Sequence, residues 1–206
     1  LLIDNQWVNA ENGTTFERRN SLSNSVVTEA ASASIGDARK SAESAHAAFK
    51  TWRQSPPSER RRLLLKAADI LEGMTPRFIE VMAVEVGASA LWAGFNVHLA
   101  ANVFREAASL ATQIQGETIP TDKPGALSMT IRQPVGAILS IVPWNGTVVL
   151  AARAIAYPIV CGNHSTICGK NVIASSSASS TAAKGINRLS SVMNTAAPVS
   201  ATETTG

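Results

Sequence analysis

The segment from Gln133 to Asn163, QPVGAILSIVPWNGTVVLAARAIAYPIVCGN, places the tightest limit on how this chain can fold. A short apolar run, Ala137–Val142, ends in a rigid Pro-Trp-Asn turn and leads at once into an apolar run of helical length, Thr147–Val160. The first run is typical of a buried strand and the second of a buried helix. This order predicts an α/β fold in which Asn145 lies at the carboxyl end of a strand, the edge at which open α/β sheets bind ligands.

Asn145 has two interpretations at this position. Its neutral carboxamide could donate a hydrogen bond to an oxyanion that develops during a reaction. It could equally cap the helix that follows. The neighbouring Trp144 is either an anchor of the core or a ligand contact.

The chain before this segment is mostly helical in pattern. Ser34 and Asp37 form a capping-box start, and Ser55 is a plausible N-cap with Pro56 at the first helical position. Gly87 is a plausible helix end. Helices are predicted over Ser34–Trp52, Pro56–Leu71, Thr75–Val86, Ala90–Ile114 and Thr147–Val160, and strands over Leu1–Val8, Ala126–Arg132 and Ala137–Val142.

After Asn163 the composition shifts toward Ser, Ala and Thr, with one weak amphipathic helix over Ile186–Met193. We therefore divide the chain into residues 1–163 and a divergent continuation, residues 164–206.

The amino-acid composition and net charge exclude some classes of function. Apolar residues make up 45% of the 206 residues and charged residues 16%, with a net charge of +3, which is typical of a folded globular chain without a basic face. The charged run Glu59–Arg62 is interpreted as a solvated helix face rather than a nucleic-acid patch, because no aromatic residue interleaves with it.

Cys161 and Cys168 fit neither a disulfide framework nor a zinc pattern, so we expect reduced thiols in a cytoplasmic chain. No signal peptide and no run of membrane-spanning length is visible, and no metal site is expected, since His46, His98 and His164 lack partners at ligand spacing.

Five segments in order resemble the N-terminal portion of the NAD(P)-dependent aldehyde dehydrogenases. They are Leu2–Val8 (LIDNQWV), Ala47–Trp52 with Pro57–Arg60, Glu85–Gly87 (EVG), Gln115–Pro120 (QGETIP) and the PVG…PWN…GN segment of Gln133–Asn163. Each is short, but their common order makes the resemblance specific. The last segment is most similar to members that act on aromatic aldehydes such as salicylaldehyde or vanillin.

The resemblance implies an α/β fold of helices, a truncated Rossmann-like parallel sheet and an oligomerisation-type hairpin around residues 126–133. It implies oxidation of an aldehyde, here an aromatic one, to a carboxylic acid with NAD or NADP, through a cysteine thiolate and a glutamate-activated water. Asn145 would donate to the oxyanion. The implied cofactor-binding residues are Ile141, Val142, Pro143, Trp144 and Lys170, and the implied substrate-facing residues are Gly146, Val149 and Arg153. The Arg153 cation, on an otherwise apolar helix, either contacts a hydroxylated aldehyde or lies at a solvated surface.

The sequence also departs from the family pattern. A gapless alignment puts Cys168 where the family has its cofactor-binding lysine, so Lys170 could serve only with a local insertion. Neither cysteine has the flanking pattern of the family's nucleophile, and the catalytic cysteine and glutamate of the family lie beyond the matched portion. We therefore expect a truncated chain that is inactive alone, binds NAD weakly and exposes apolar strand edges and helix faces.

The alternative is a non-catalytic interaction protein that forms a homo-oligomer or associates with full-length family members. An unrelated helical structural domain is a third interpretation. Neither nucleic acid nor a membrane is an expected partner.

Overall fold

The computed structural model describes residues 1–143, 145–169 and 172–175, with side-chain surroundings described through Ile167. Its helices are α1 (Ile35–Trp52), α2 (Pro57–Gly73), α3 (Thr75–Val86), α4 (Ala90–Leu110) and α5 (Thr147–Val160). Its strands are β1 (Leu2–Ile3), β2 (Gln6–Trp7), β3 (Thr15–Arg19), β4 (Val26–Ala31), β5 (Thr118–Ile119), β6 (Ser128–Met129), β7 (Ala137–Ile141), β8 (His164–Gly169) and β9 (Val172–Ser175). The predicted helix over Ile186–Met193 lies outside the described residues, as do Trp144 and Lys170.

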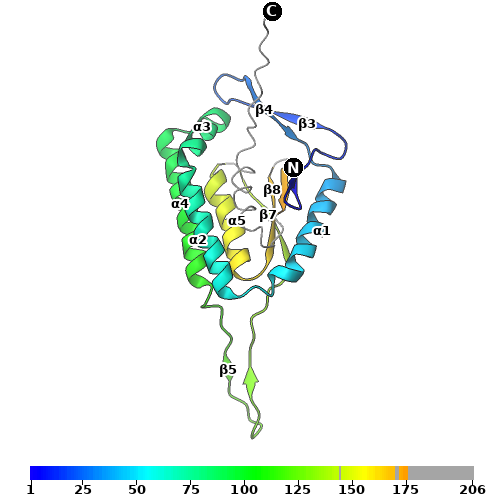
Figure 1. Cartoon of the computed structure of the whole chain (residues 1–206), viewed down its shortest axis with the longest axis vertical. Coiled ribbons are helices and arrows are strands. Elements are labelled where there is room, and N and C mark those ends of the chain that lie inside the picture. Colours follow the sequence, from blue (N-terminus) through cyan, green and yellow to red (C-terminus); the bar gives the residue numbers. More distant parts are fainter. Residues whose placement is uncertain (144, 170–171, 176–206) are drawn as a thin grey trace, which may run out of the picture.

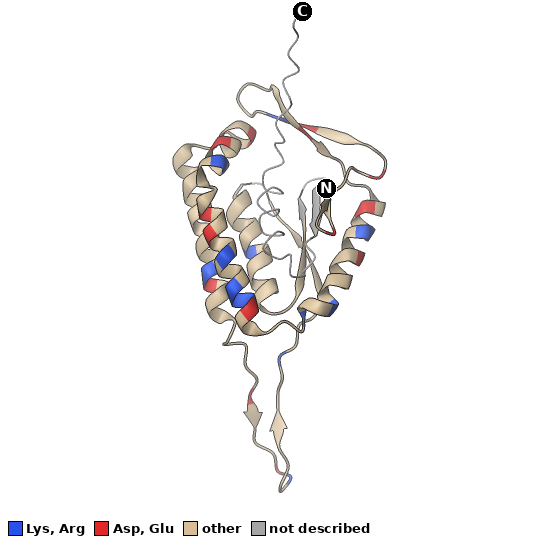
Figure 2. Ribbon diagram, viewed as in Figure 1, with Lys and Arg blue, Asp and Glu red and all other residues tan. Residues whose placement is uncertain are grey.

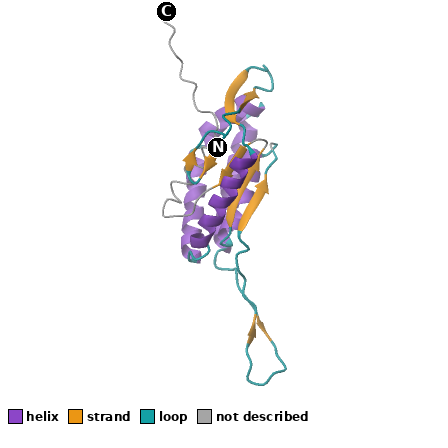
Figure 3. Cartoon of the chain, turned by 90° about the vertical axis from the view of Figure 1, so that its right-hand side faces the viewer, coloured by secondary structure: helices purple, strands orange, loops and turns teal. Residues whose placement is uncertain are grey.

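The central sheet has the order β2-β1-β9-β8-β7 and is covered by helices on both faces (Figures 1 and 3). Strands β7 and β8 are parallel and are joined by α5, whereas β9 runs antiparallel to β8, so the sheet is mixed. Helix α1 packs against one face, while α5 packs against the other and is itself covered by α4 and α2. The predicted α/β architecture is confirmed. Strand β8 continues the sheet directly past residue 163, where the composition shifts.

Two hairpins project from this body. The β3–β4 hairpin lies beside the end of α3, and the β5–β6 arm extends away from the opposite end of the molecule (Figure 1). The strand predicted over Ala126–Arg132 is wrong in length, since β6 contains two residues that pair only with β5. A two-stranded ribbon without a third strand or a packed face has little to hold a longer ladder together.

The core lies where α4 contacts α2, α3 and α5. The side of α4 that faces these helices is built from small residues, and Ala93, Ala100, Ala101 and Ala107 are each 0% exposed. Small side chains let the helix backbones approach closely, so that larger residues of the neighbouring helices, such as Phe78 and Ile155, are buried in the same cluster. Removing such a side chain from water stabilises the fold by about 1.5–3 kcal/mol.

Helix boundaries follow local signals with one exception. The predicted capping box is confirmed, because the Ser34 hydroxyl accepts from the Asp37 N–H while the Asp37 carboxylate accepts from the Ser34 N–H. Gly87 ends α3 with φ 67°, as predicted. The predicted Ser55 cap is wrong: α2 begins at Pro57, because a proline forces the residue before it into extended conformation and so makes Pro56 the N-cap.

The prediction of a buried strand over 137–142 is also wrong in part. Side chains of β7 alternate between half-buried and exposed, and Leu139 and Ile141 are 64% and 79% exposed. These side chains are exposed because β7 is the edge strand of the described sheet and α1 lies mainly over β8 and β9. The expectation of exposed apolar strand surface is thereby confirmed for β7.

Charges of both signs are interspersed along α2 (Figure 2), whereas the charged residues of α4 are the adjacent pair Arg105 and Glu106 near its end. The interpretation of the Glu59–Arg62 run as a solvated face needs correction, because Arg60 is only 8% exposed and points into the protein. Arg62 fits the interpretation, since it is exposed and pairs with Glu59. Among the described helices, none has both the length and the apolar character that crossing a membrane requires.

Candidate functional site

The turn between β7 and α5 places Asn145 at the carboxyl end of the parallel strand pair. Strand β7 ends at Ile141, which pairs in register with Cys168 of β8, and α5 begins at Thr147. The N-cap of α5 is Gly146, and no side chain caps this helix end. The interpretation of Asn145 as the helix cap is therefore wrong. Its side chain is exposed and forms no hydrogen bond with the described residues, which leaves the carboxamide free to contact a ligand.

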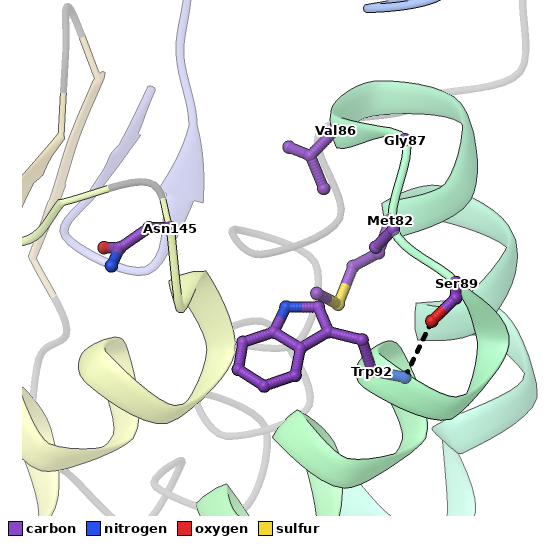
Figure 4. A pocket seen from close by; sticks show the side chains of 7 residues that line it. Met82, Val86, Gly87, Ser89, Trp92 and Asn145 are labelled. Carbon is purple, nitrogen blue, oxygen red and sulfur yellow. Dashed lines mark hydrogen bonds between the residues drawn. The ribbon is translucent and has the colours of Figure 1, made fainter.

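A cavity of about 350 Å³ lies between this turn and the junction of α3 with α4. It is lined by Met82, Val86, Gly87, Ala88, Ser89, Trp92 and Asn145. In Figure 4 the indole of Trp92 extends toward the start of α5, while the Asn145 carboxamide points away from Trp92. A cavity of this size is within the range of small-molecule sites.

Local backbone geometry explains how Trp92 reaches this cavity. Gly87 turns the chain with a left-handed conformation, and the Ser89 hydroxyl accepts a hydrogen bond from the Trp92 N–H at 3.2 Å to begin α4. The Trp92 ring lies against Phe95, with ring centroids 5.8 Å apart, and both rings are about half exposed. Sequence reasoning missed Trp92; the available signal was an aromatic residue at the start of an alanine-rich helix, just after the EVG turn.

The predicted substrate-facing residues share one side of α5. Gly146, Val149 and Arg153 are spaced by three and four residues, so they lie on one helical face. Gly146 is buried, Val149 is half-buried and Arg153 is exposed, with no ion pair to Arg153 among the described residues. Tyr157 continues this face and donates a hydrogen bond to Glu106 of α4 at 2.8 Å. This bond raises the pKa of Tyr157, although the nearby Arg153 charge opposes the shift.

The predicted cofactor wall is open apolar surface. Ile141 and Pro143 are exposed and Val142 is half-buried, at the carboxyl end of β7. Exposed apolar side chains at this edge fit a flat group that lies across the strand end. Because Lys170 and Trp144 lie outside the described residues, their predicted roles stay predictions.

No described side chain can supply a nucleophilic sulfur beside Asn145. Cys161 is exposed but follows the last residue of α5, whereas Asn145 precedes the first. A 14-residue helix separates its ends by about 21 Å. Cys168 lies in β8 and pairs with Ile141 of β7. The structure does not describe its side chain. Among the described residues no group of His, Cys, Asp and Glu side chains could hold a metal ion.

The far end of α5 is held by residues whose role sequence reasoning did not assign. The Asn163 side-chain oxygen accepts from the backbone N–H groups of Val135 and Gly136, at 2.7 and 3.1 Å, which fixes the start of β7 against the turn before β8. Arg60 donates to the backbone oxygen of Val160 at 3.2 Å. The site is therefore mounted on a strand and a helix that are fixed at the end opposite Asn145.

Comparisons with known proteins agree on one family. The model of the aldehyde dehydrogenase family matches residues 7–179. Salicylaldehyde dehydrogenase of Pseudomonas sp. strain C18 is 71% identical over 163 residues, and vanillin dehydrogenase of Pseudomonas fluorescens is 51% identical over 163 residues. In both cases the match covers 79% of this chain and 34% of the relative. The chain therefore spans about a third of the length of these curated relatives.

Solved structures give the same result. The crystal structure of salicylaldehyde dehydrogenase from Pseudomonas putida G7, complexed with salicylaldehyde, superposes with a TM-score of 0.82 at 60% identity. The match covers 94% of this chain and 38% of that one. An NAD-dependent benzaldehyde dehydrogenase from Corynebacterium glutamicum superposes with a TM-score of 0.80 at 28% identity and covers 96% of this chain and 41% of its own.

Proposed function

Because the chain belongs to the aldehyde dehydrogenase family, we propose that it supplies the oxyanion donor and the aldehyde-facing surface of an enzyme that oxidises an aldehyde to a carboxylic acid with NAD or NADP. One observation carries the proposal. The Asn145 carboxamide is exposed at the carboxyl end of β7 and forms no hydrogen bond with the described residues; Asn145 lines a cavity of about 350 Å³, and its carboxamide points away from Trp92 (Figure 4).

Asn145 would act through the side-chain N–H of its carboxamide. When a thiolate adds to the aldehyde carbonyl, negative charge develops on the carbonyl oxygen, and a hydrogen bond from the amide strengthens as the charge grows. Loss of one such donor typically costs about 2.7–4 kcal/mol of transition-state stabilisation. The thiolate and the general base would come from the part of the family fold that this chain does not match, so the chain alone is expected to be inactive.

The cofactor would lie against Ile141, Val142 and Pro143, with Trp144 and Lys170 as further predicted contacts. NAD or NADP, when bound, supplies the acceptor for the hydride that leaves the aldehyde carbon. This chain's own part is to offer an apolar surface that excludes water on one side of the reacting carbon.

The proposed substrate is an aromatic aldehyde with a ring hydroxyl, of the salicylaldehyde type. Three observations support this class: the half-exposed Trp92 ring at the cavity, the exposed Arg153 on the α5 face of Gly146 and Val149, and the identity to salicylaldehyde and vanillin dehydrogenases. Aromatic rings stack or pack edge to face at about 4.5–7 Å. A guanidinium could donate to the ring hydroxyl.

A chimera tests the function directly. Residues 1–163 would replace the matched segment of the Pseudomonas salicylaldehyde dehydrogenase, and salicylaldehyde-dependent NADH formation would be followed at 340 nm. We expect an active chimera in which Asn145→Ala lowers kcat by about 10²–10³-fold with little change in KM. Asn102→Ala, on the exposed side of α4, is the matched control and should leave kcat unchanged. An active chimera that tolerates Asn145→Ala would refute the role of Asn145.

We also propose that this chain associates with a second chain through the β5–β6 arm. The arm stands away from the body in Figure 1 and exposes apolar side chains along its length. Leu127, Met129 and Ile131 are 71%, 54% and 70% exposed. An extended segment of this kind can add to the sheet of another subunit, and we propose either a second copy or a full-length family member as that subunit. Size-exclusion chromatography with and without the full-length enzyme would measure it, and a monomer in both runs would contradict it.

A further inference from the structure

His164 is enclosed at the start of β8, but its ring has no partner. The residue is 2% exposed, and neither ring nitrogen forms a hydrogen bond with the described residues. Its backbone is held, because the His164 N–H donates to the oxygen of Gly136 at 3.1 Å. Most buried polar side chains in folded proteins are hydrogen-bonded, so an enclosed and unpaired imidazole calls for a physical explanation.

The imidazole faces α1. The Ser165 hydroxyl donates to the backbone oxygen of Ala154 in α5 at 2.9 Å, which assigns Ser165 to the α5 side of the sheet. Successive residues of a strand point to opposite faces. His164 and Thr166 therefore lie on the face against which α1 packs.

Three hydroxyl groups at the interface between α1 and the sheet also lack hydrogen-bond partners among the described residues. Ser41 is 0% exposed, Thr166 is 6% exposed, and the hydroxyl oxygens of Ser41, Ser44 and Thr166 lack hydrogen-bond partners among the described residues. We name these three residues and His164 the polar cluster. Hydroxyl groups can serve a neutral imidazole as donors or acceptors, but none of them carries the negative charge that an imidazolium would need.

Among the residues that the structure describes, no charge near His164 compensates for this lack. The Asp37 carboxylate, buried at the first turn of α1, accepts hydrogen bonds from the backbone N–H groups of Ser34 and Glu11. Arg60, at the corner between α1 and α2, is a cation, and Arg153 of α5 is exposed. Strands β7 and β9 carry no ionisable side chain, and Cys168 of β8 is not described beyond its backbone. The remaining charged or titratable residues of α1 are exposed: Arg39, Lys40, Glu43, His46 and Lys50.

We propose that His164 is an acid-sensitive latch between α1 and the sheet: the neutral imidazole permits α1 to pack on β8 through the polar cluster, and protonation releases the helix.

The burial of His164 decides how the packing of α1 depends on pH. Desolvation lowers the pKa of His164 from 6.5 to about 4, because the enclosed site disfavours the charged form. The unfolded chain takes up the proton below pH 6.5 and the folded chain does not. The stabilisation is therefore complete above pH 6.5 and is lost progressively as the pH falls toward 4. At pH 5 the linkage amounts to an increase of about 30-fold in the equilibrium constant for opening.

Hydrogen exchange read by mass spectrometry tests the latch on the intact chain. Peptides from α1 should lose protection by about 20-fold between pH 7 and pH 5, after correction for intrinsic exchange rates, while peptides from α4 keep theirs. His164→Gln should remove this pH dependence, and His46→Gln, on the exposed side of α1, should retain it. Equal loss of protection in α1 and α4 would contradict a local latch, as would an unchanged pH dependence in His164→Gln.

A second measurement does not depend on the folding of any variant. The ring proton signals of His164 in the wild-type chain should titrate below pH 5 in the native state. A native midpoint for His164 near 6.5 would overturn the proposal.

Discussion

Arg60 offers the sharpest test of what holds this fold together, because it is a buried cation that has no carboxylate partner within the described part of the chain. Its Nε donates to the Ser55 hydroxyl at 2.9 Å, and its two terminal nitrogens donate to the backbone oxygens of Val160 at 3.2 Å and Arg53 at 3.0 Å. The guanidinium thus joins the corner between α1 and α2 to the last turn of α5. Burial lowers the pKa of Arg60, which shows that part of the gain from these bonds is offset by desolvation.

The magnitude can be worked from the three acceptors. Hydrogen bonds to a charged donor contribute about 1.5–3 kcal/mol each, but water can replace the donor at the exposed Arg53 and the half-buried Ser55. The Val160 oxygen lies in the core, where an unpaired carbonyl costs about 1–3 kcal/mol. We therefore expect Arg60→Met, which keeps an unbranched apolar stem but removes the guanidinium, to lower the free energy of unfolding by about 3 kcal/mol.

Denaturant unfolding followed by circular dichroism measures this loss. Arg62→Met is the matched control: Arg62 is in the same helix two residues later, is exposed and pairs with Glu59, so its loss should fall within experimental error. Arg60→Lys should be intermediate, because an ammonium group cannot reach three acceptors in the planar arrangement of a guanidinium. Wild-type stability in Arg60→Met, or an equal loss in Arg62→Met, would refute the reasoning.

Three further substitutions follow from the same contacts and can be measured by the same unfolding assay. Asn163→Ala should destabilise by about 2–4 kcal/mol, because two backbone N–H groups lose their acceptor, while Asn163→Asp, which keeps an acceptor, should lose less. Gly87→Ala should destabilise by at least about 1 kcal/mol, since φ is 67° and an added Cβ would lie 2.6 Å from the Ser21 hydroxyl; an unchanged stability would show that the turn can relax. Trp52→Phe removes a 3.1 Å hydrogen bond to the Ile159 oxygen and should cost about 1 kcal/mol, and a larger loss would point to packing rather than to the bond.

The features that the sequence predicted correctly depend on neighbours along the chain. The Ser34–Asp37 capping box, the left-handed Gly87 and the strand-turn-helix at Asn145 are each specified within a few residues. Arg60 was interpreted wrongly for the opposite reason. Its run of charges looks solvated locally, and the buried carbonyl among its acceptors, that of Val160, lies 100 residues away.

The same distinction applies to the site. The position of Asn145 is a local property of the turn, whereas the cavity also needs Trp92 and the junction of α3 with α4, which tertiary packing alone brings to it. The exposure of Ile141 depends on which strands flank β7, and a periodicity of apolar residues carries no information about that.

Side-chain hydrogen bonds hold the carboxyl end of α5, whereas the proposed site lies at its amino end. At the carboxyl end, Arg60, Trp52 and Asn163 connect the helix and the turn that follows it to α1, α2 and β7 through side-chain hydrogen bonds. At the amino end, Gly146 is an N-cap without a side-chain bond and Asn145 is exposed. An uncapped helix start costs about 0.5–2 kcal/mol relative to one with a good cap, and the partial positive charge of this helix start lies beside Asn145, the proposed oxyanion donor. Substitutions at the carboxyl end should therefore change unfolding without changing the chemistry of the site. Asn145→Ala should leave the unfolding free energy of this chain unchanged while it removes the proposed oxyanion donor, and a large destabilisation by Asn145→Ala would contradict this division.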